Sequence, residues 1–244
     1  IYSISKLANT QINDLITKLG ITKSEAEKLI KSSNDVVKIL NKRSELKKFI
    51  SNYVHAKRGR SISKIWSEFI SKGIEDIESL SQIDNKSTLK EMGLYDNEVE
   101  SLILESQKKI NSNIMKECGV SSASNHKYED NGYANPKLFV KLHPAGISLA
   151  TGVSVLTVCK HQKLVADHLG LTKPDTITKQ AYDQGIDSLK KLNIDITDMI
   201  SLACIGVYNI NQLKDIDVPS ISKQTNIDTK KLATYKNKAN KMCK

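Results

Sequence analysis

The sequence has few of the residues that bend, cross-link or stiffen a chain. Gly (11) and Pro (4) are scarce among its 244 residues, only 5% are aromatic, and there are four cysteines. Long stretches instead carry apolar residues with a helical period. We therefore expect an all-α protein whose cores consist of Ile, Leu and Val side chains.

The cysteines and histidines lack the spacing of a metal site. No two cysteines form a Cys-x-x-Cys pair, the usual mark of structural zinc, and the five histidines show no ligand spacing. A nucleotide-binding glycine loop, a nucleophile elbow and a metal-binding helix motif are missing as well. We expect no cofactor, no small-molecule substrate and no enzymatic activity, and thiols kept reduced.

Long hydrophobic runs are also missing. No apolar stretch reaches the length that crosses a bilayer, and no signal peptide is visible. These features favour an intracellular protein with no membrane partner, in the cytoplasm, the nucleoid or an organelle interior.

Basic residues exceed acidic ones, with a net charge of +10, and they concentrate at the two ends. Residues 1–60 carry 13 basic and 5 acidic groups, residues 61–120 carry 7 and 11, and residues 189–244 carry 10 and 5. An excess of this kind favours an anionic partner, although abundant Lys, Asn and Ile together are also typical of an AT-rich genome. Only three arginines are present, so base-specific recognition is not expected.

Internal repeats are visible in two ungapped alignments. "GIEDIESLSQID" (73–84) aligns with "GVYNINQLKDID" (206–217), and "ITKLGITKSEAEKLI" (16–30) aligns with "LKEMGLYDNEVESLI" (89–103). "IYSISKL" (1–7) resembles "VYNINQL" (207–213). We therefore expect that the chain opens inside a repeat and that the native protein extends further towards its N-terminus.

Each repeat predicts a helix, a tight turn and a second helix. The residues expected at the turns, where a positive φ is needed, are Gly20, Gly93, Gly170 and Asn226. Thr22 with Glu25 predicts a capping box for the helix that follows the first turn, and Thr172 with Asp175 predicts a similar cap after the third.

These motifs resemble the helix-hairpin-helix family, "LGITKSEAEKLI" most closely, and an uncharacterised helix-hairpin-helix-type domain of bacterial and archaeal proteins. The resemblance implies tandem, SAM-like units in two halves joined by an irregular linker. The expected divisions are unit 1 (1–56, incomplete at its N-terminus), unit 2 (57–112), a linker or long loop (113–146), a divergent unit 3 (147–186) and unit 4 (187–244).

In DNA-binding members of this family, two glycines in the hairpin let backbone amides approach a phosphate at a helix N-terminus. Here Thr22, Tyr95, Thr172 and Asp228 stand where the second glycine would be. The candidate nucleic-acid contacts are Thr22, Lys23, Ser24, Thr172 and Lys173, together with the basic joint Lys57, Arg58 and Arg60. Two functions stay open: binding of nucleic-acid backbones without sequence preference, or a structural or adaptor subunit that assembles with other proteins.

Overall fold

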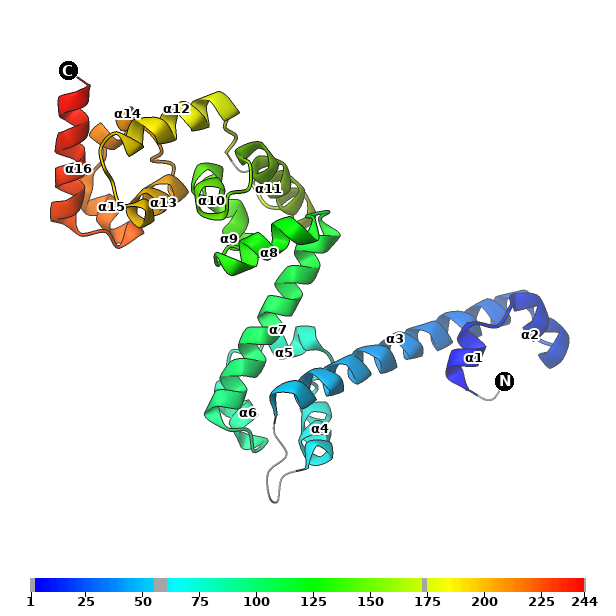
Figure 1. Ribbon diagram of the computed structural model, residues 1–244. Helices are drawn as coiled ribbons and strands as arrows, with labels where there is room; N and C mark the ends of the chain where they lie inside the picture. The colour runs from blue at the N-terminus through cyan, green and yellow to red at the C-terminus, as the bar shows by residue number, and fades with distance from the viewer. Residues whose placement is uncertain (1–2, 55–60, 173–174, 244) are drawn as a thin grey trace. The chain divides into compact units, whose positions relative to one another are not determined.

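The computed structural model describes residues 3–54, 61–172 and 175–243, and every regular element within these ranges is a helix (Figure 1). The prediction of an all-α protein is confirmed. The chain divides into an N-terminal domain (Ile1–Ile110) and a C-terminal domain (Asn111–Lys244), each compact by its internal contacts.

The helices of the N-terminal domain are α1 (Ile4–Ala8), α2 (Ile12–Leu19), α3 (Lys23–Tyr53), α4 (Ile62–Ser71), α5 (Ile77–Ser81), α6 (Lys86–Glu91) and α7 (Asp96–Glu117), the last of which ends beyond the domain boundary. Those of the C-terminal domain are α8 (Ser122–Asp130), α9 (Pro136–Lys141), α10 (Pro144–Thr151), α11 (Val155–Leu169), α12 (Lys179–Lys190), α13 (Ile196–Cys204), α14 (Ile210–Lys214), α15 (Val218–Thr225) and α16 (Thr229–Met242).

The spacing of the helix starts recurs along the chain. The intervals between successive starts are identical in α8–α11 and in α13–α16, and they are nearly the same in α4–α7. The intervals within α1–α3 equal those within α14–α16. We call α1–α3 the first helix set, α4–α7 the second, α8–α11 the third and α13–α16 the fourth.

Local chemistry explains where these helices begin and turn. The predicted capping box is confirmed at the start of α3, where Thr22 and Glu25 bond to each other's backbone amides. Before the last helix of each set the chain passes through a left-handed residue: Gly20, Gly93, Gly152 or Asn226, with φ between 57° and 83°. Glycine and asparagine adopt this conformation at the lowest cost, so each set can reverse the chain in a short turn.

The expected linker at 113–146 is wrong. Most of this segment is helical, and Tyr128 of α8 and Phe139 of α9 are fully buried in the core of the third set. Its Ser and Asn residues include helix caps, because Ser121 caps the N-terminus of α8 and Asn135 caps that of α9. A composition typical of loops therefore came from closely spaced helix ends.

The expected hairpin of unit 3 is also wrong. Gly170 does end α11 in the left-handed conformation, but residues 171–172 and 175–178 are not helical, and α12 begins only after its cap at Thr178. Ile177 in this non-helical stretch is buried against Ala145 and Ala203. The burial of Ile177 places a non-helical residue in the core, a short distance before α12 begins.

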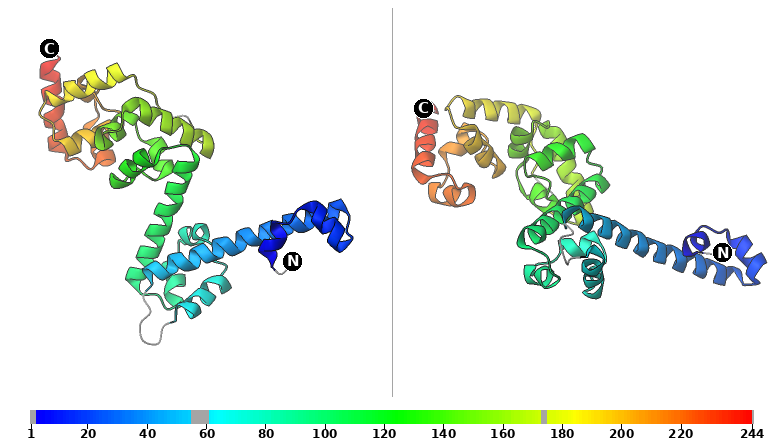
Figure 2. Two further views of the ribbon diagram at one scale, coloured as in Figure 1. Left: turned by 45° about the vertical axis from the view of Figure 1, so that its right-hand side comes forward. Right: turned by 60° about the horizontal axis from the view of Figure 1, so that its bottom comes forward.

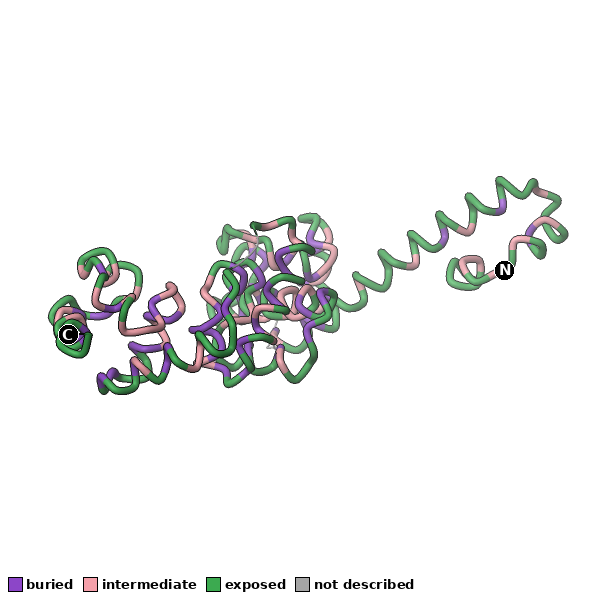
Figure 3. The backbone as a smooth tube through the Cα atoms, turned by 90° about the horizontal axis from the view of Figure 1, so that it is seen from above, coloured by how far each residue is buried: buried purple, intermediate pink, exposed green. Residues whose placement is uncertain are grey.

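Among the described residues, the second, third and fourth sets each contain a cluster of buried apolar side chains, whereas the first set shows isolated buried residues such as Leu15 and Ala26. In the second set, Ile65 and Phe69 of α4 join residues of α5, α6 and α7 in one buried cluster. In the first set, α1 and α2 both pack on the N-terminal half of α3 (Figure 2). Figure 3 shows that most of the backbone along this part of α3 is exposed, with only isolated buried residues.

Candidate nucleic-acid interface

The first hairpin places Thr22, Lys23 and Ser24 at the N-terminus of α3. The Glu25 carboxylate accepts a 2.8 Å hydrogen bond from the Thr22 backbone amide and another of 2.8 Å from the Thr22 hydroxyl. The backbone hydrogen bond from Thr22 lowers the pKa of Glu25, which keeps this carboxylate charged. A negative charge of the protein itself therefore lies where a phosphate would approach the helix.

Lys23 and Ser24 keep some capacity to bind an anion. Both residues are exposed, and the first amides of a helix have no partner within the helix itself. The Lys23 ammonium group, however, lies 3.9 Å from the Glu27 carboxylate, one turn along α3. A phosphate at this helix start would therefore compete with the Glu27 carboxylate for the Lys23 ammonium group.

At the second and fourth hairpins, backbone amides are likewise bonded to carboxylates of the protein itself. At the second, Glu98 accepts a 2.9 Å hydrogen bond from the Tyr95 amide, and Asp96 pairs with Lys90. At the fourth, Asp228 accepts bonds from the amides of Lys230 and Lys231, at 2.8 and 3.2 Å. These carboxylates satisfy the amides that a glycine-rich hairpin would offer to phosphate.

The third hairpin lies at Gly152, a position that the sequence analysis missed. Thr151, Gly152, Val153 and Ser154 there correspond to Thr225, Asn226, Ile227 and Asp228 at the fourth. Ser154 caps α11 through its hydroxyl, and the first turn of α11 contains no acidic residue. The pattern glycine, apolar residue, hydroxyl residue, also present at Gly20, was the signal that could have found it.

Matching hydrogen bonds support this correspondence between the third and fourth hairpins. The Ser148 hydroxyl donates to the Val153 carbonyl at 2.8 Å, and the Ser222 hydroxyl donates to the Ile227 carbonyl at 2.7 Å. In both hairpins the threonine before the turn donates its hydroxyl to the backbone one helical turn earlier, at 2.7 Å. The same local geometry is therefore built twice in the C-terminal domain.

The predicted contact residues that the structure describes belong to two domains, the first hairpin to the N-terminal one and Thr172 to the C-terminal one. Thr22, Lys23 and Ser24 are consecutive at α3, whereas Thr172 is an exposed residue after α11 and caps no helix. Lys173 and the joint residues Lys57, Arg58 and Arg60 lie outside the described part of the chain. Among the described residues, the first hairpin therefore presents three candidates side by side at one helix start.

The last helix, α16, is rich in lysine. Within α16 there are five lysines and no acidic residue: Lys230, Lys231, Lys236, Lys238 and Lys241. Three of these five ammonium groups already have a bonded partner in the protein. Lys231 pairs with Asp198, while Lys236 and Lys238 donate to the backbone carbonyls of Ile216 and Leu192. The side chains of Lys230 and Lys241 have no bonded partner among the described residues.

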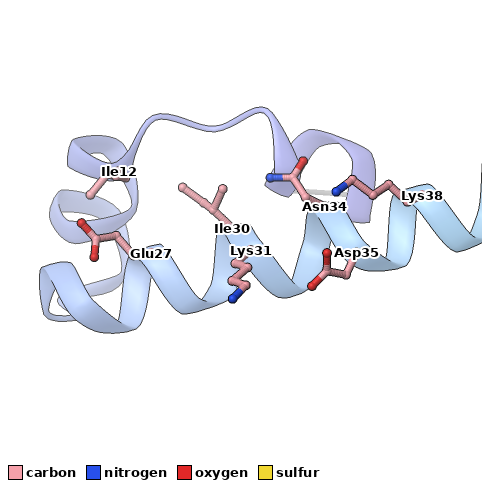
Figure 4. A pocket seen from close by; sticks show the side chains of 7 residues that line it. All are labelled: Ile12, Glu27, Ile30, Lys31, Asn34, Asp35 and Lys38. Atoms are coloured by element: carbon pink, nitrogen blue, oxygen red, sulfur yellow. The ribbon is translucent and has the colours of Figure 1, made fainter. Parts of the chain in front are cut away.

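The first set also contains a shallow hollow of about 430 Å³ between α2 and α3 (Figure 4). Ile12 and Ile30 lie on its two sides, and Glu27, Lys31 and Asp35 are among the residues that border it. Charges of both signs alternate along this rim. The hollow therefore has neither the uniform positive charge that a phosphate needs nor an enclosed apolar floor.

The described residues contain neither a metal-binding cluster nor a membrane-spanning helix. No group of three or more His, Cys, Asp or Glu side chains there could hold a metal ion. Over the same residues, none of the helices combines the length and the apolar character needed to cross a membrane.

Neither a family model, nor a curated protein, nor a solved structure matches the chain. The function is therefore inferred from the geometry of the chain itself.

Proposed function

We propose that the chain is a non-catalytic protein of tandem helix-hairpin-helix units that binds nucleic-acid backbones without sequence preference. The observation that carries this proposal is α16, a helix with five lysines and no acid, in a chain of net charge +10. Lysine ammonium groups bind phosphates as point charges and do not read bases. Contact through side chains also agrees with hairpin amides that are already bonded to Glu25, Glu98 and Asp228.

The test is a fluorescence-anisotropy titration with a mixed-sequence duplex and a single strand, at low and at physiological salt. The variant Lys230→Gln/Lys241→Gln removes the two lysines of α16 whose ammonium groups have no bonded partner among the described residues. We expect weaker binding to every sequence and a salt slope that is smaller by about one per lysine removed.

The matched control is Lys179→Gln/Lys190→Gln on α12. It removes the same total charge, but each of these lysines is paired with an acid, Asp183 or Asp187, so we expect it to bind nearly as well as the parent chain. An equal loss in both variants would indicate a response to net charge alone. No binding of the parent chain at low salt would refute the proposal.

A structural or adaptor subunit is the second candidate. It is favoured by apolar side chains of the first set, Ile4, Leu19 and Leu29, that are 45%, 53% and 40% exposed. Large exposed apolar side chains on neighbouring helices are typical of surfaces that pack on another element. A chain that binds no nucleic acid but forms a stable complex through this surface would support the second candidate over the first.

A further inference from the structure

In the described residues, the first helix set shows no counterpart of one helix that the other three sets contain. In each of those sets a leading helix precedes the two short helices: α4, α8 or α13. No such helix precedes α1 among the described residues. We propose that the first set carries an open docking face for an amphipathic helix of the α4 type, which completes it as α4 completes the second set.

One position on the last helix of each set shows this face most clearly. Leu29 is 40% exposed, whereas its counterparts Leu102, His161 and Tyr235 are 0%, 6% and 5% exposed. The side chain is large in all four sets. The difference in exposure therefore comes from what covers the position and not from the residue that occupies it.

Two further positions extend the face across the short helices. Leu19, before the turn, is 53% exposed, while Met92 at the same place in the second set is 6% exposed. Ile4 is 45% exposed and its counterpart Ile77 is 5% exposed. Ile4, Leu19 and Leu29 come from α1, α2 and α3, so the open face involves every helix of the set.

The leading helix reaches these positions in each complete set. In the fourth, the Tyr235 hydroxyl donates to Asp198 of α13 at 2.7 Å. In the third, the Tyr128 hydroxyl of α8 lies 3.0 Å from Nδ1 of His161. In the second, Ile65 of α4 and Met92 line one hollow of about 270 Å³. In the second, third and fourth sets, the element that covers these positions is therefore a helix.

The residues of the open face also select the kind of helix. His161 and Tyr235 offer polar atoms to the leading helix, but Leu29 offers none, as Leu102 does not. Burial of a polar group against Leu29 without a partner would be unfavourable. The matching helix therefore carries apolar side chains one turn apart, as α4 carries Ile65 and Phe69, both buried.

The alignment of the first two sets provides a direct experiment. Ile1 aligns with Ile74, so residues 61–73 can be joined in register to the N-terminus of the full chain. Hydrogen exchange of the backbone amides of α1 and α2 is then measured in the parent chain and in the graft. We expect at least about tenfold slower exchange in the graft, since these helices then open less often. The amides of α13–α16 serve as a folding reference and should not change.

The matched control is the same graft with Ile65→Asp and Phe69→Asp, counted in the grafted segment. It adds an equal length of chain without the apolar face, and we expect exchange as fast as in the parent chain. A second readout is maleimide labelling of Leu29→Cys, mapped by peptide against the exposed Cys243. Labelling should be slower in the graft and unchanged in the control.

Three results would overturn the proposal. The graft could leave exchange and labelling as fast as in the parent chain. The control could protect as well as the graft, which would indicate an effect of added chain alone. Finally, the ungrafted chain could dimerise in sedimentation experiments with position 29 protected, which would make a second copy of the chain the occupant. None of these results depends on whether the chain binds nucleic acid.

Discussion

The first and the second helix sets place corresponding residues in opposite environments. Both have a short helix, a second short helix, a left-handed glycine and a long helix, and Gly20 and Gly93 occupy equivalent turns. Yet Leu102 is fully buried, while Leu29 is 40% exposed. The turn and the caps are therefore local properties of the sequence, whereas the core requires a further helix.

This difference explains why the helix sets offer different kinds of candidate surface. A hairpin reverses the chain whether or not the set is complete, since glycine and the cap act over a short stretch of chain. Complete sets bury their apolar positions and present charged helices such as α16. The incomplete set presents Ile4, Leu19 and Leu29, which favours contact with a helix over contact with phosphate.

The largest expected effect comes from truncating the equivalent leucines. Leu102→Ala removes a fully buried side chain from the core of the second set, and we expect a loss of about 2–5 kcal/mol in the free energy of unfolding. Leu29→Ala truncates an exposed side chain, and we expect a loss below about 1 kcal/mol. Urea unfolding of both variants, with hydrogen exchange to assign each transition, measures the pair. Equal losses would show that Leu29 is already covered in solution.

A smaller effect is expected from removing the hydroxyl that links α13 to α16. In Tyr235→Phe the buried bond to Asp198 is lost, and hydrogen bonds to charged groups contribute about 1.5–3 kcal/mol. The lower end is expected, because Asp198 also pairs with Lys231 at 2.5 Å. The shift is measured as the change in urea midpoint of the C-terminal domain.

Asp198→Asn separates the two interactions of this carboxylate. The amide oxygen can still accept from Tyr235, but the ion pair with Lys231 is lost. We expect a smaller loss than in Tyr235→Phe, because Lys231 is exposed and exposed ion pairs contribute little. A larger loss in Asp198→Asn would mean that the ion pair, and not the hydroxyl, holds α13 against α16.

Much of the fold could be predicted from the sequence because its signals are local. The helical period, the Thr22–Glu25 cap and the alignment of 73–84 with 206–217 each depend on short stretches of chain. The third set was harder to recognise because its core has Phe139 and His161 where the second set has Leu80 and Leu102. Its caps also cluster Ser, Asn and Pro in a way that is typical of a loop.

The candidate site was less predictable because it depends on where charges lie. Sequence alone could place Thr22, Lys23 and Ser24 at a helix start. It could not show that the Glu25 carboxylate bonds the Thr22 amide, or that Lys23 lies 3.9 Å from Glu27. Gly170 shows the same contrast between local and tertiary causes. Its positive φ follows from glycine, but the burial of Ile177 in a non-helical stretch before α12 depends on the tertiary core.

The smallest expected effect distinguishes the third set from the fourth by its response to pH. Burial lowers the pKa of His161 below its ordinary value of 6.5, with a further decrease from the nearby Lys160 ammonium. The unfolded chain therefore binds a proton near pH 6.5 that the folded chain does not bind until lower pH. The stabilisation is fully present above pH 6.5 and is lost as the pH falls towards the folded pKa.

His161→Gln tests this difference, because glutamine keeps a polar group near Tyr128 but does not titrate. We expect the urea midpoint of the parent C-terminal domain to fall between pH 7.5 and 5.5, and to fall less in the variant. His143 is a second contributor, since burial also lowers its pKa, so a residual slope should remain. In the fourth set, Tyr235 occupies the equivalent position, and its pKa is raised, mainly by burial, away from this range. Hydrogen exchange resolved by helix should therefore show acid-induced opening of α8 and α11 before that of α13 and α16, and simultaneous opening would contradict a role for His161.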